Sequence, residues 1–183
     1  KSAVTGWKET TLATKAEFEV AIKAKFPTEE FSLRTFPFTI EWKTTNTFET
    51  EIASKTNNYK VVYNVASKQI TSSIGYSNEG AQASFASNSN VAWLKDNNIR
   101  ITSNNKTIEV TNDENPAIVN GSDYVHRQEF GIDRGMWWNA SGTQLAYYRK
   151  DETMVGNYPI INWNEREAVN KDIKYPMAGM TSE

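Results

Sequence analysis

The chain contains 183 residues, of which 38% are hydrophobic and 12% aromatic, and its formal net charge is −2. This length allows one domain with a sizeable core, and the near-balanced charge excludes the basic surface of a nucleic-acid-binding domain and a polybasic membrane-binding segment. The absence of cysteine excludes disulfides and thiolate metal sites, and no apolar run reaches the roughly 20 residues that a membrane-spanning helix needs.

Residues 1–35 are predicted to form an N-terminal helical segment. Thr14 and Glu17 have the spacing of a capping box, in which each side chain accepts a hydrogen bond from a backbone N–H at the start of a helix. The residues that follow with the spacing of one helix face are Phe18, Ala21, Ile22, Lys25 and Phe26. Because Pro27 stops this pattern, a helix is predicted over residues 14–26, packed on the outside or the end of a sheet. An unstructured leader is the alternative.

From about residue 36 the pattern changes to short strands separated by turns, most clearly over residues 83–111. Four runs there are rich in Val, Ile, Thr and aromatic residues: Ala83–Phe85, Val91–Leu94, Ile99–Thr102 and Thr107–Val110. The residues between them are mainly Asn, Asp and Ser, which tolerate left-handed backbone and favour hairpin turns. This stretch is predicted to form one four-stranded antiparallel meander.

The same pattern precedes and follows that meander. The upstream strands are predicted at Ile40–Trp42, Thr47–Ile52, Tyr59–Val65 and Gln69–Thr71. The downstream strands are predicted at Met136–Trp138, Leu145–Tyr148 and Tyr158–Ile161. The segment Ala86–Trp93 also resembles Ala140–Tyr147, with an aromatic residue before the turn and another closing the second strand.

A four-stranded unit that recurs at roughly 40–55 residues is typical of propeller blades. The chain is therefore predicted to be mostly β, with about three four-stranded antiparallel propeller-type blades over residues 36–183 and a helix before them. A β-sandwich is the alternative, because its strands recur with similar spacing. Three blades do not close a ring, so self-association through the open blade edges is expected.

The residue types needed for catalysis are sparse. His126 is the single histidine, and the chain has no G-x-S-x-G nucleophile elbow and no glycine-rich phosphate loop. Adjacent carboxylates occur at Glu29–Glu30, Asp113–Glu114 and Asp151–Glu152, a pattern more typical of solvated turns than of an acid–base pair. No catalytic residue, metal site or cofactor is predicted.

One polar segment interrupts the strand series at Asp123–Ile132 and contains Gln128 and Glu129. A cluster of ionisable residues between two strand units favours a loop or short helix that projects from the sheet. A connecting helix with solvated charges is the alternative.

Residues 91–180 resemble the N-terminal propeller region of dipeptidyl peptidase IV and its bacterial relatives, in the prolyl oligopeptidase clan. The matching stretches, in the order and spacing of the family, are Val91–Ile99, Val110–Asp113, Ile118–Gly121, Asp123–Gly131, Trp138–Arg149, Asp151–Val155 and Ile173–Gly179. The first 80 residues are similar only in their general pattern.

The resemblance implies a non-catalytic role for this chain, because in that family a separate α/β-hydrolase domain carries the Ser, Asp and His. A short helix from an early blade presents two adjacent glutamates, which bind the free α-ammonium of the substrate. These positions fall at Gln128 and Glu129 of this chain. Glu129 matches the family, whereas Gln128 departs from it and supplies no charge, which puts strict dipeptidyl peptidase specificity in doubt.

The resemblance also implies a chain truncated before the hydrolase domain, with an extracytoplasmic location, either in the bacterial periplasm or secreted. The leading hypothesis is the non-catalytic propeller portion of a dipeptidyl peptidase IV-like serine peptidase, whose partner is a peptide N-terminus. The alternative is a stand-alone peptide- or glycan-binding or assembly module that uses exposed aromatic residues such as Trp137 and Trp163. A purely structural paralogue is a third reading.

Overall fold

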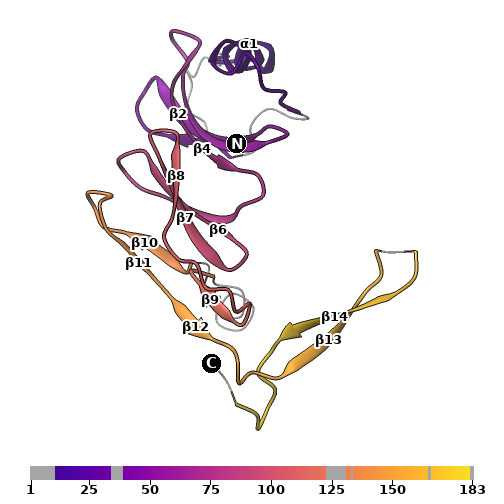
Figure 1. The fold of residues 1–183 in the computed structure, drawn as a ribbon. Coiled ribbons are helices and arrows are strands. Elements are labelled where there is room, and N and C mark those ends of the chain that lie inside the picture. The colour runs from indigo at the N-terminus through magenta and orange to yellow at the C-terminus, as the bar shows by residue number, and fades with distance from the viewer. Residues whose placement is uncertain (1–10, 34–38, 123–130, 133, 165, 182–183) are drawn as a thin grey trace, which may run out of the picture. The chain divides into compact units, whose positions relative to one another are not determined.

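The computed structural model describes residues 11–33, 39–122, 131–132, 134–164 and 166–181 (Figure 1). The chain divides into two compact units, residues 1–79 and residues 80–183. Each unit is described by itself below. None of the helices among the described residues is long and apolar enough to cross a membrane.

The first unit begins with helix α1, Lys15–Lys25, which the sequence predicts over residues 14–26. Both capping-box hydrogen bonds are present: the Glu17 backbone N–H donates to Thr14 Oγ1 at 3.3 Å, and the Thr14 backbone N–H donates to Glu17 Oε2 at 2.9 Å. The helix ends at Phe26, whose N–H donates to the Ile22 carbonyl at 2.8 Å. The predicted helix and its capping box are confirmed.

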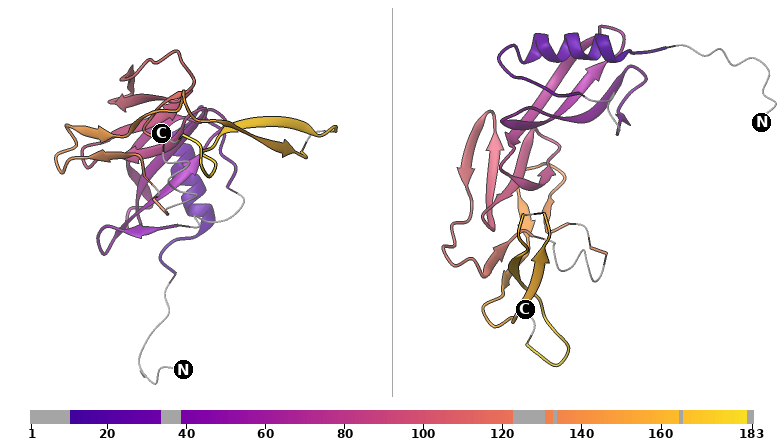
Figure 2. Two further views of the ribbon diagram at one scale, coloured as in Figure 1. Left: turned by 90° about the horizontal axis from the view of Figure 1, so that it is seen from below. Right: turned by 90° about the vertical axis from the view of Figure 1, so that its right-hand side faces the viewer.

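An antiparallel sheet of four sequential strands completes this unit, and Figure 2 shows the helix beside it. The strands are β1 (Glu41–Trp42), β2 (Thr47–Ala53), β3 (Asn57–Asn64) and β4 (Gln69–Ser77). Phe18 of the helix is fully buried against Phe48 and Tyr63, with ring centroids 6.2 and 5.2 Å away. Since each buried Phe or Ile side chain contributes about 1.5–3 kcal/mol, this shared core holds the helix on the sheet.

The second unit begins with another four-stranded antiparallel meander, at the position where the sequence predicts one. Its strands are β5 (Ala81–Phe85), β6 (Asn90–Lys95), β7 (Asn98–Ser103) and β8 (Lys106–Glu109). The turns after β6 and β7 each have two residues with positive φ, Asp96–Asn97 and Asn104–Asn105. Two successive positive-φ residues match the twist of a tight hairpin, and Asn and Asp adopt them at low cost.

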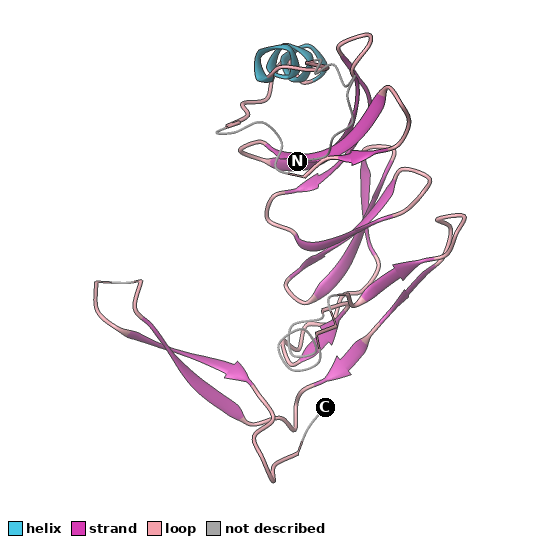
Figure 3. Ribbon diagram, turned by 180° about the vertical axis from the view of Figure 1, so that it is seen from behind, coloured by secondary structure: helices cyan, strands magenta, loops and turns pink. Residues whose placement is uncertain are grey.

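After residue 111 the predicted third four-stranded unit is wrong for the described part of the chain, which forms three two-stranded sheets instead (Figure 3). They pair β9 (Ile118–Asn120) with β12 (Arg149–Asp151), β10 (Met136–Trp138) with β11 (Leu145–Tyr147), and β13 (Asn157–Asn162) with β14 (Val169–Lys174). The sequence does not predict β9, β12 or β14. All three are short or carry charged residues, so they lack the apolar alternation on which strand prediction depends.

The two similar segments noted in the sequence lie side by side through their turns. Ser87 Oγ donates to the Ala140 carbonyl at 2.8 Å, and the side-chain amides of Asn88 and Asn90 both donate to the Gly142 carbonyl, at 3.0 and 3.1 Å. The two segments of the second unit that have similar turn sequences therefore also contact each other directly through those turns.

Candidate functional site

The predicted substrate-binding residues, Gln128 and Glu129, lie outside the described residues, as does His126. The structure does describe the two ends of the segment that carries them. The candidate site is therefore built from the strands where this segment leaves the sheet and returns to it.

The segment is an insertion in a β-ladder opposite Tyr148. β11 and β12 follow one another with only Tyr148 between them. Their partner strands β10 and β9 are separated by residues 121–135, although Met136 pairs with Tyr147 and Asn120 pairs with Arg149. Fifteen residues thus lie opposite a single one, as in an extreme β-bulge, a feature common beside functional sites.

Tyr148 joins the two ends of this insertion through its backbone. The Gly121 N–H donates to the Tyr148 carbonyl at 2.7 Å, and the Tyr148 N–H donates to the Gly135 carbonyl at 3.0 Å. Gly121 has a φ of +71°, which favours glycine, and a Cβ on Gly135 would collide with the Gly121 carbonyl. We call Gly121, Gly135 and Tyr148 the insertion base. The backbone at Gly121 and the backbone at Gly135 lie so close together that a side chain at either position would clash or strain the chain.

A polar network lies next to the insertion base and centres on Asn120, which is fully buried. Its side-chain amide donates to Asp113 Oδ2 at 2.9 Å, to the Asn97 carbonyl at 3.3 Å and to Asn98 Oδ1 at 3.4 Å. Arg149 Nη2 donates to the other Asp113 oxygen, Oδ1, at 3.0 Å. One carboxylate therefore links β9 to β12 immediately beside the insertion base.

The charge state of Asp113 follows from these contacts. The hydrogen bond from Asn120 and then that from Arg149 lower the pKa of the Asp113 carboxyl below its usual value. Asp113 is thus an anion at neutral pH, and both of its hydrogen bonds are charge-assisted.

The opposite face of the same strand pair carries an ion pair that is almost buried. Lys150 Nζ lies 3.2 Å from Glu152 Oε1, with the two side chains 7% and 11% exposed. Both residues line a pocket of about 430 Å³ together with Asn97, Pro116, Val119, Ser122, Lys171, Ile173 and Lys174. Ser122 is the first residue after Gly121, so this pocket begins where the insertion leaves the sheet.

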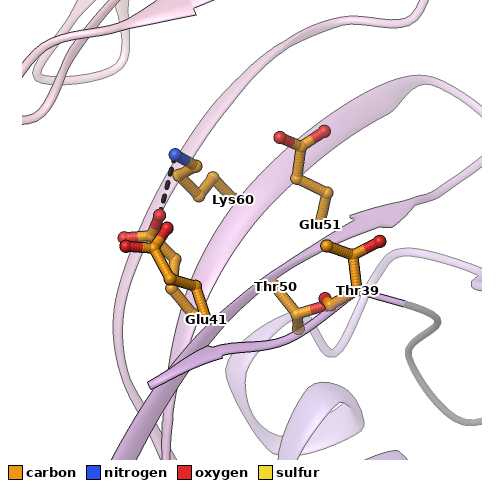
Figure 4. Close-up of a pocket in the computed structure, with 6 residues that line it drawn as sticks. Thr39, Glu41, Thr50, Glu51 and Lys60 are labelled. Carbon is orange, nitrogen blue, oxygen red and sulfur yellow. Dashed lines mark hydrogen bonds and ion pairs between the residues drawn. The ribbon is translucent and has the colours of Figure 1, made fainter. Parts of the chain in front are cut away.

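A second pocket, of about 380 Å³, lies within the first unit (Figure 4). It is lined by Thr39, Glu41, Glu49, Thr50, Glu51 and Lys60. Lys60 Nζ pairs with Glu49 Oε1 at 2.7 Å, and Lys43 Nζ pairs with Glu41 Oε1 at 2.8 Å. The wall is therefore acidic but partly neutralised. No group of three His, Cys, Asp or Glu side chains suited to a metal ion occurs among the residues that the structure describes.

The adjacent carboxylates differ from the solvated turns that the sequence favours, because at least one member of each pair has a side-chain partner. Glu29 accepts a hydrogen bond from Tyr59 Oη, Asp113 binds Asn120 and Arg149, and Glu152 pairs with Lys150. Their neighbours Glu30, Glu114 and Asp151 are exposed, although Glu30 forms an ion pair with Lys55 and Asp151 accepts hydrogen bonds from Thr153. Sequence reasoning thus missed Asp113, whose partners are 7 and 36 residues away in the chain.

Three comparisons relate the chain to known proteins. Residues 43–183 match the family model described as the dipeptidyl peptidase IV (DPP IV) N-terminal region. Dipeptidyl aminopeptidase B of Saccharomyces cerevisiae is 38% identical over 127 residues, and dipeptidyl peptidase 4 of Trichophyton rubrum is 32% identical over 97 residues. The aligned parts cover 64% and 49% of this chain, but only 16% and 12% of those proteins.

A solved structure is similar over most of the chain. A crystal structure from Bacteroides ovatus, named as a dipeptidyl aminopeptidase IV, superimposes with a TM-score of 0.70 at 30% sequence identity and covers 96% of this chain. The chain spans 23% of that protein. The similarity therefore concerns one region of a much longer polypeptide.

Proposed function

The chain belongs to the dipeptidyl peptidase IV N-terminal region family, and on that premise we propose that it is the non-catalytic propeller portion of a dipeptidyl peptidase IV-like serine peptidase. Its role is to recognise the free N-terminus of a peptide substrate. As the family resemblance implies, the hydrolytic step belongs to a separate α/β-hydrolase domain, and this chain has no G-x-S-x-G elbow.

The insertion opposite Tyr148 is the observation that carries this proposal. It contains Gln128 and Glu129, and its described ends are joined through the Tyr148 backbone. A carboxylate such as Glu129 binds an ammonium group through charge-assisted hydrogen bonds. Gln128 adds an acceptor without charge, so binding is weaker than that of a paired-glutamate site.

The propeller assignment is supported by two four-stranded antiparallel meanders, β1–β4 and β5–β8. It is supported further by the contact between the turn at residues 87–90 and the turn at residues 140–142, because similar units in a propeller pack side by side.

Peptide binding tests the proposed function. The pure chain should bind Gly-Pro-Ala-Ala with a free amine at least about tenfold more tightly than the N-acetylated peptide, a difference of about 1.4 kcal/mol. Glu129→Gln should remove this preference, and Gln128→Glu should increase it. Isothermal titration calorimetry measures all three proteins, and Glu114→Gln serves as the control because Glu114 is an exposed carboxylate.

Equal affinity for the free and acetylated peptides would contradict amine recognition. Hydrolysis of a Gly-Pro chromogenic substrate by the pure chain would contradict the non-catalytic assignment. Retention of the preference for the free-amine peptide after Glu129→Gln would exclude a role for that carboxylate in amine recognition.

A stand-alone peptide- or glycan-binding or assembly module is the second candidate, favoured by Trp163, whose side chain is 76% exposed. Exposed aromatic rings bind sugars and peptides. Trp137, the other tryptophan named for this role, packs edge-to-face against Tyr148 at 4.9 Å and is half-buried. Loss of glycan or peptide binding in Trp163→Ala, with no dependence on a free amine, would favour this candidate.

An extracytoplasmic location, in the periplasm or outside the cell, is part of the proposal, because the family resemblance implies it. Fractionation of the native host, with the chain followed by antibody, tests it. Recovery of the chain with cytoplasmic markers would overturn it.

A further inference from the structure

We propose that Asp113 is a positioning residue, which holds the insertion base closed and thereby sets the affinity of the inserted segment for a peptide N-terminus. The inference rests on the proposed function for its ligand. Its structural part concerns only residues that the structure describes.

The Asp113 side chain joins both strands beside the insertion base. Arg149 and Asn120 pair across β12 and β9, and the carboxylate accepts one hydrogen bond from each, at 3.0 and 2.9 Å. In the sequence, Arg149 follows Tyr148 and Asn120 precedes Gly121. Each contact of Asp113 therefore lies one residue from a backbone hydrogen bond of the insertion base.

The orientation of Asn120 depends on this carboxylate. The Asn120 Oδ1 atom is buried with no hydrogen-bond partner, so the side chain is held only through its amide N–H groups. Among their acceptors, Asp113 is the closest, at 2.9 Å against 3.3 and 3.4 Å, and the one with a charge. Hydrogen bonds to a charged acceptor are about twice as strong as neutral ones.

The backbone of Asp113 is itself fixed, which makes it a suitable anchor. Its N–H donates to Asn98 Oδ1 at 2.9 Å, and the same oxygen accepts from Thr111 Oγ1 at 3.0 Å. Asn98 is a buried residue of β7, so the anchor extends from the four-stranded meander to the insertion base. Without the Asp113 carboxylate, Arg149 and Asn120 lose their shared acceptor and the two ends of the insertion separate more readily.

Hydrogen exchange on the full chain tests this directly, because the amide protons of Gly121 and Tyr148 form the two hydrogen bonds of the insertion base. Asp113→Asn should speed exchange at both amides by about tenfold or more, while the amides of the β6–β7 ladder keep their protection. The same variant should weaken binding of free-amine Gly-Pro-Ala-Ala by about tenfold, and Asp113→Glu, which restores the charge, should recover part of the loss. Glu114→Gln, at the exposed neighbouring carboxylate, should change neither quantity.

Unchanged exchange at Gly121 and Tyr148 in Asp113→Asn would overturn the inference. An equal loss of protection in the β6–β7 ladder would also overturn it, since Asp113 would then serve general stability rather than position. If the wild-type chain binds no free-amine peptide, the proposed function fails, and exchange at the two amides then decides alone whether Asp113 holds the insertion base.

Discussion

At the scale of single residues, Gly75 shows how closely side chain and backbone are matched in the first sheet. Tyr59 and Gly75 are paired across β3 and β4, and the Tyr59 ring lies over the glycine. A Cβ built on Gly75 would lie 2.5 and 2.6 Å from two atoms of this ring. The ring also packs against Phe26, with the two ring centroids 4.4 Å apart. It has little freedom to move away.

Gly75→Ala should therefore destabilise the first unit by about 1–3 kcal/mol, the usual cost of overpacking. Urea unfolding followed by tyrosine and tryptophan fluorescence measures it. The matched control is Gly156→Ala, because an added Cβ there meets its nearest neighbour at an ordinary 3.5 Å. A Gly75→Ala protein as stable as wild type would show that the Tyr59 ring shifts without cost.

At the scale of elements, helix α1 depends on its capping box. Thr14 Oγ1 accepts from the Glu17 N–H, and the Glu17 carboxylate accepts from the Thr14 N–H. Removing an N-cap hydroxyl costs about 1 kcal/mol. Thr14→Ala should lower the stability of the first unit by this amount in urea unfolding, whereas Thr11→Ala, at an exposed threonine outside the helix, should not.

The same cap predicts a dependence on pH. The hydrogen bond from the Thr14 backbone N–H is the main cause that lowers the pKa of Glu17 below 4.5. A carboxyl with a lowered folded-state pKa contributes stability above its unfolded value and loses it as the pH falls through the folded value. Glu17→Gln should therefore be destabilising at pH 7 but close to neutral in acid. A cost of Glu17→Gln that is equal at both pH values would contradict a charge effect.

The elements that the sequence predicts well are those specified by nearby residues. The cap at Thr14 and Glu17 depends on residues three apart, and the hairpin turn at Asp96–Asn97 depends on two residues that accept positive φ. In contrast, β9 and β12 contain three residues each and pair across 28 intervening residues, between Asn120 and Arg149. No local sequence pattern marks such short strands, because they form only when the chain on either side of the insertion comes together and pairs.

The residues of the candidate site also differ in whether nearby sequence is enough to predict them. Gln128 and Glu129 come from a family resemblance in their own segment, and they stay a prediction because they lie outside the described residues. Asp113 could not be singled out from sequence, where it stands beside Glu114 in a polar turn. Only the pairing of Asn120 with Arg149 brings its two partners together.

At the scale of the whole molecule, the open edge at β8 bears on self-association. β8 is the last strand of its sheet, and all four of its residues are exposed, including Ile108 at 60%. An exposed edge strand offers unpaired N–H and C=O groups to another chain. We therefore propose that copies of this chain associate through such edges.

Light scattering at several protein concentrations tests this association. The wild-type mass should rise with concentration, and Ile108→Lys should reduce the rise, since a charge on an edge strand disfavours pairing. The matched control is Val20→Lys, because Val20 is equally apolar and 69% exposed but lies on helix α1. If both variants reduce association alike, general surface hydrophobicity drives it rather than the strand edge. A wild-type mass that stays at 20.7 kDa at every concentration would exclude self-association, and the β8 edge would then be available for another polypeptide.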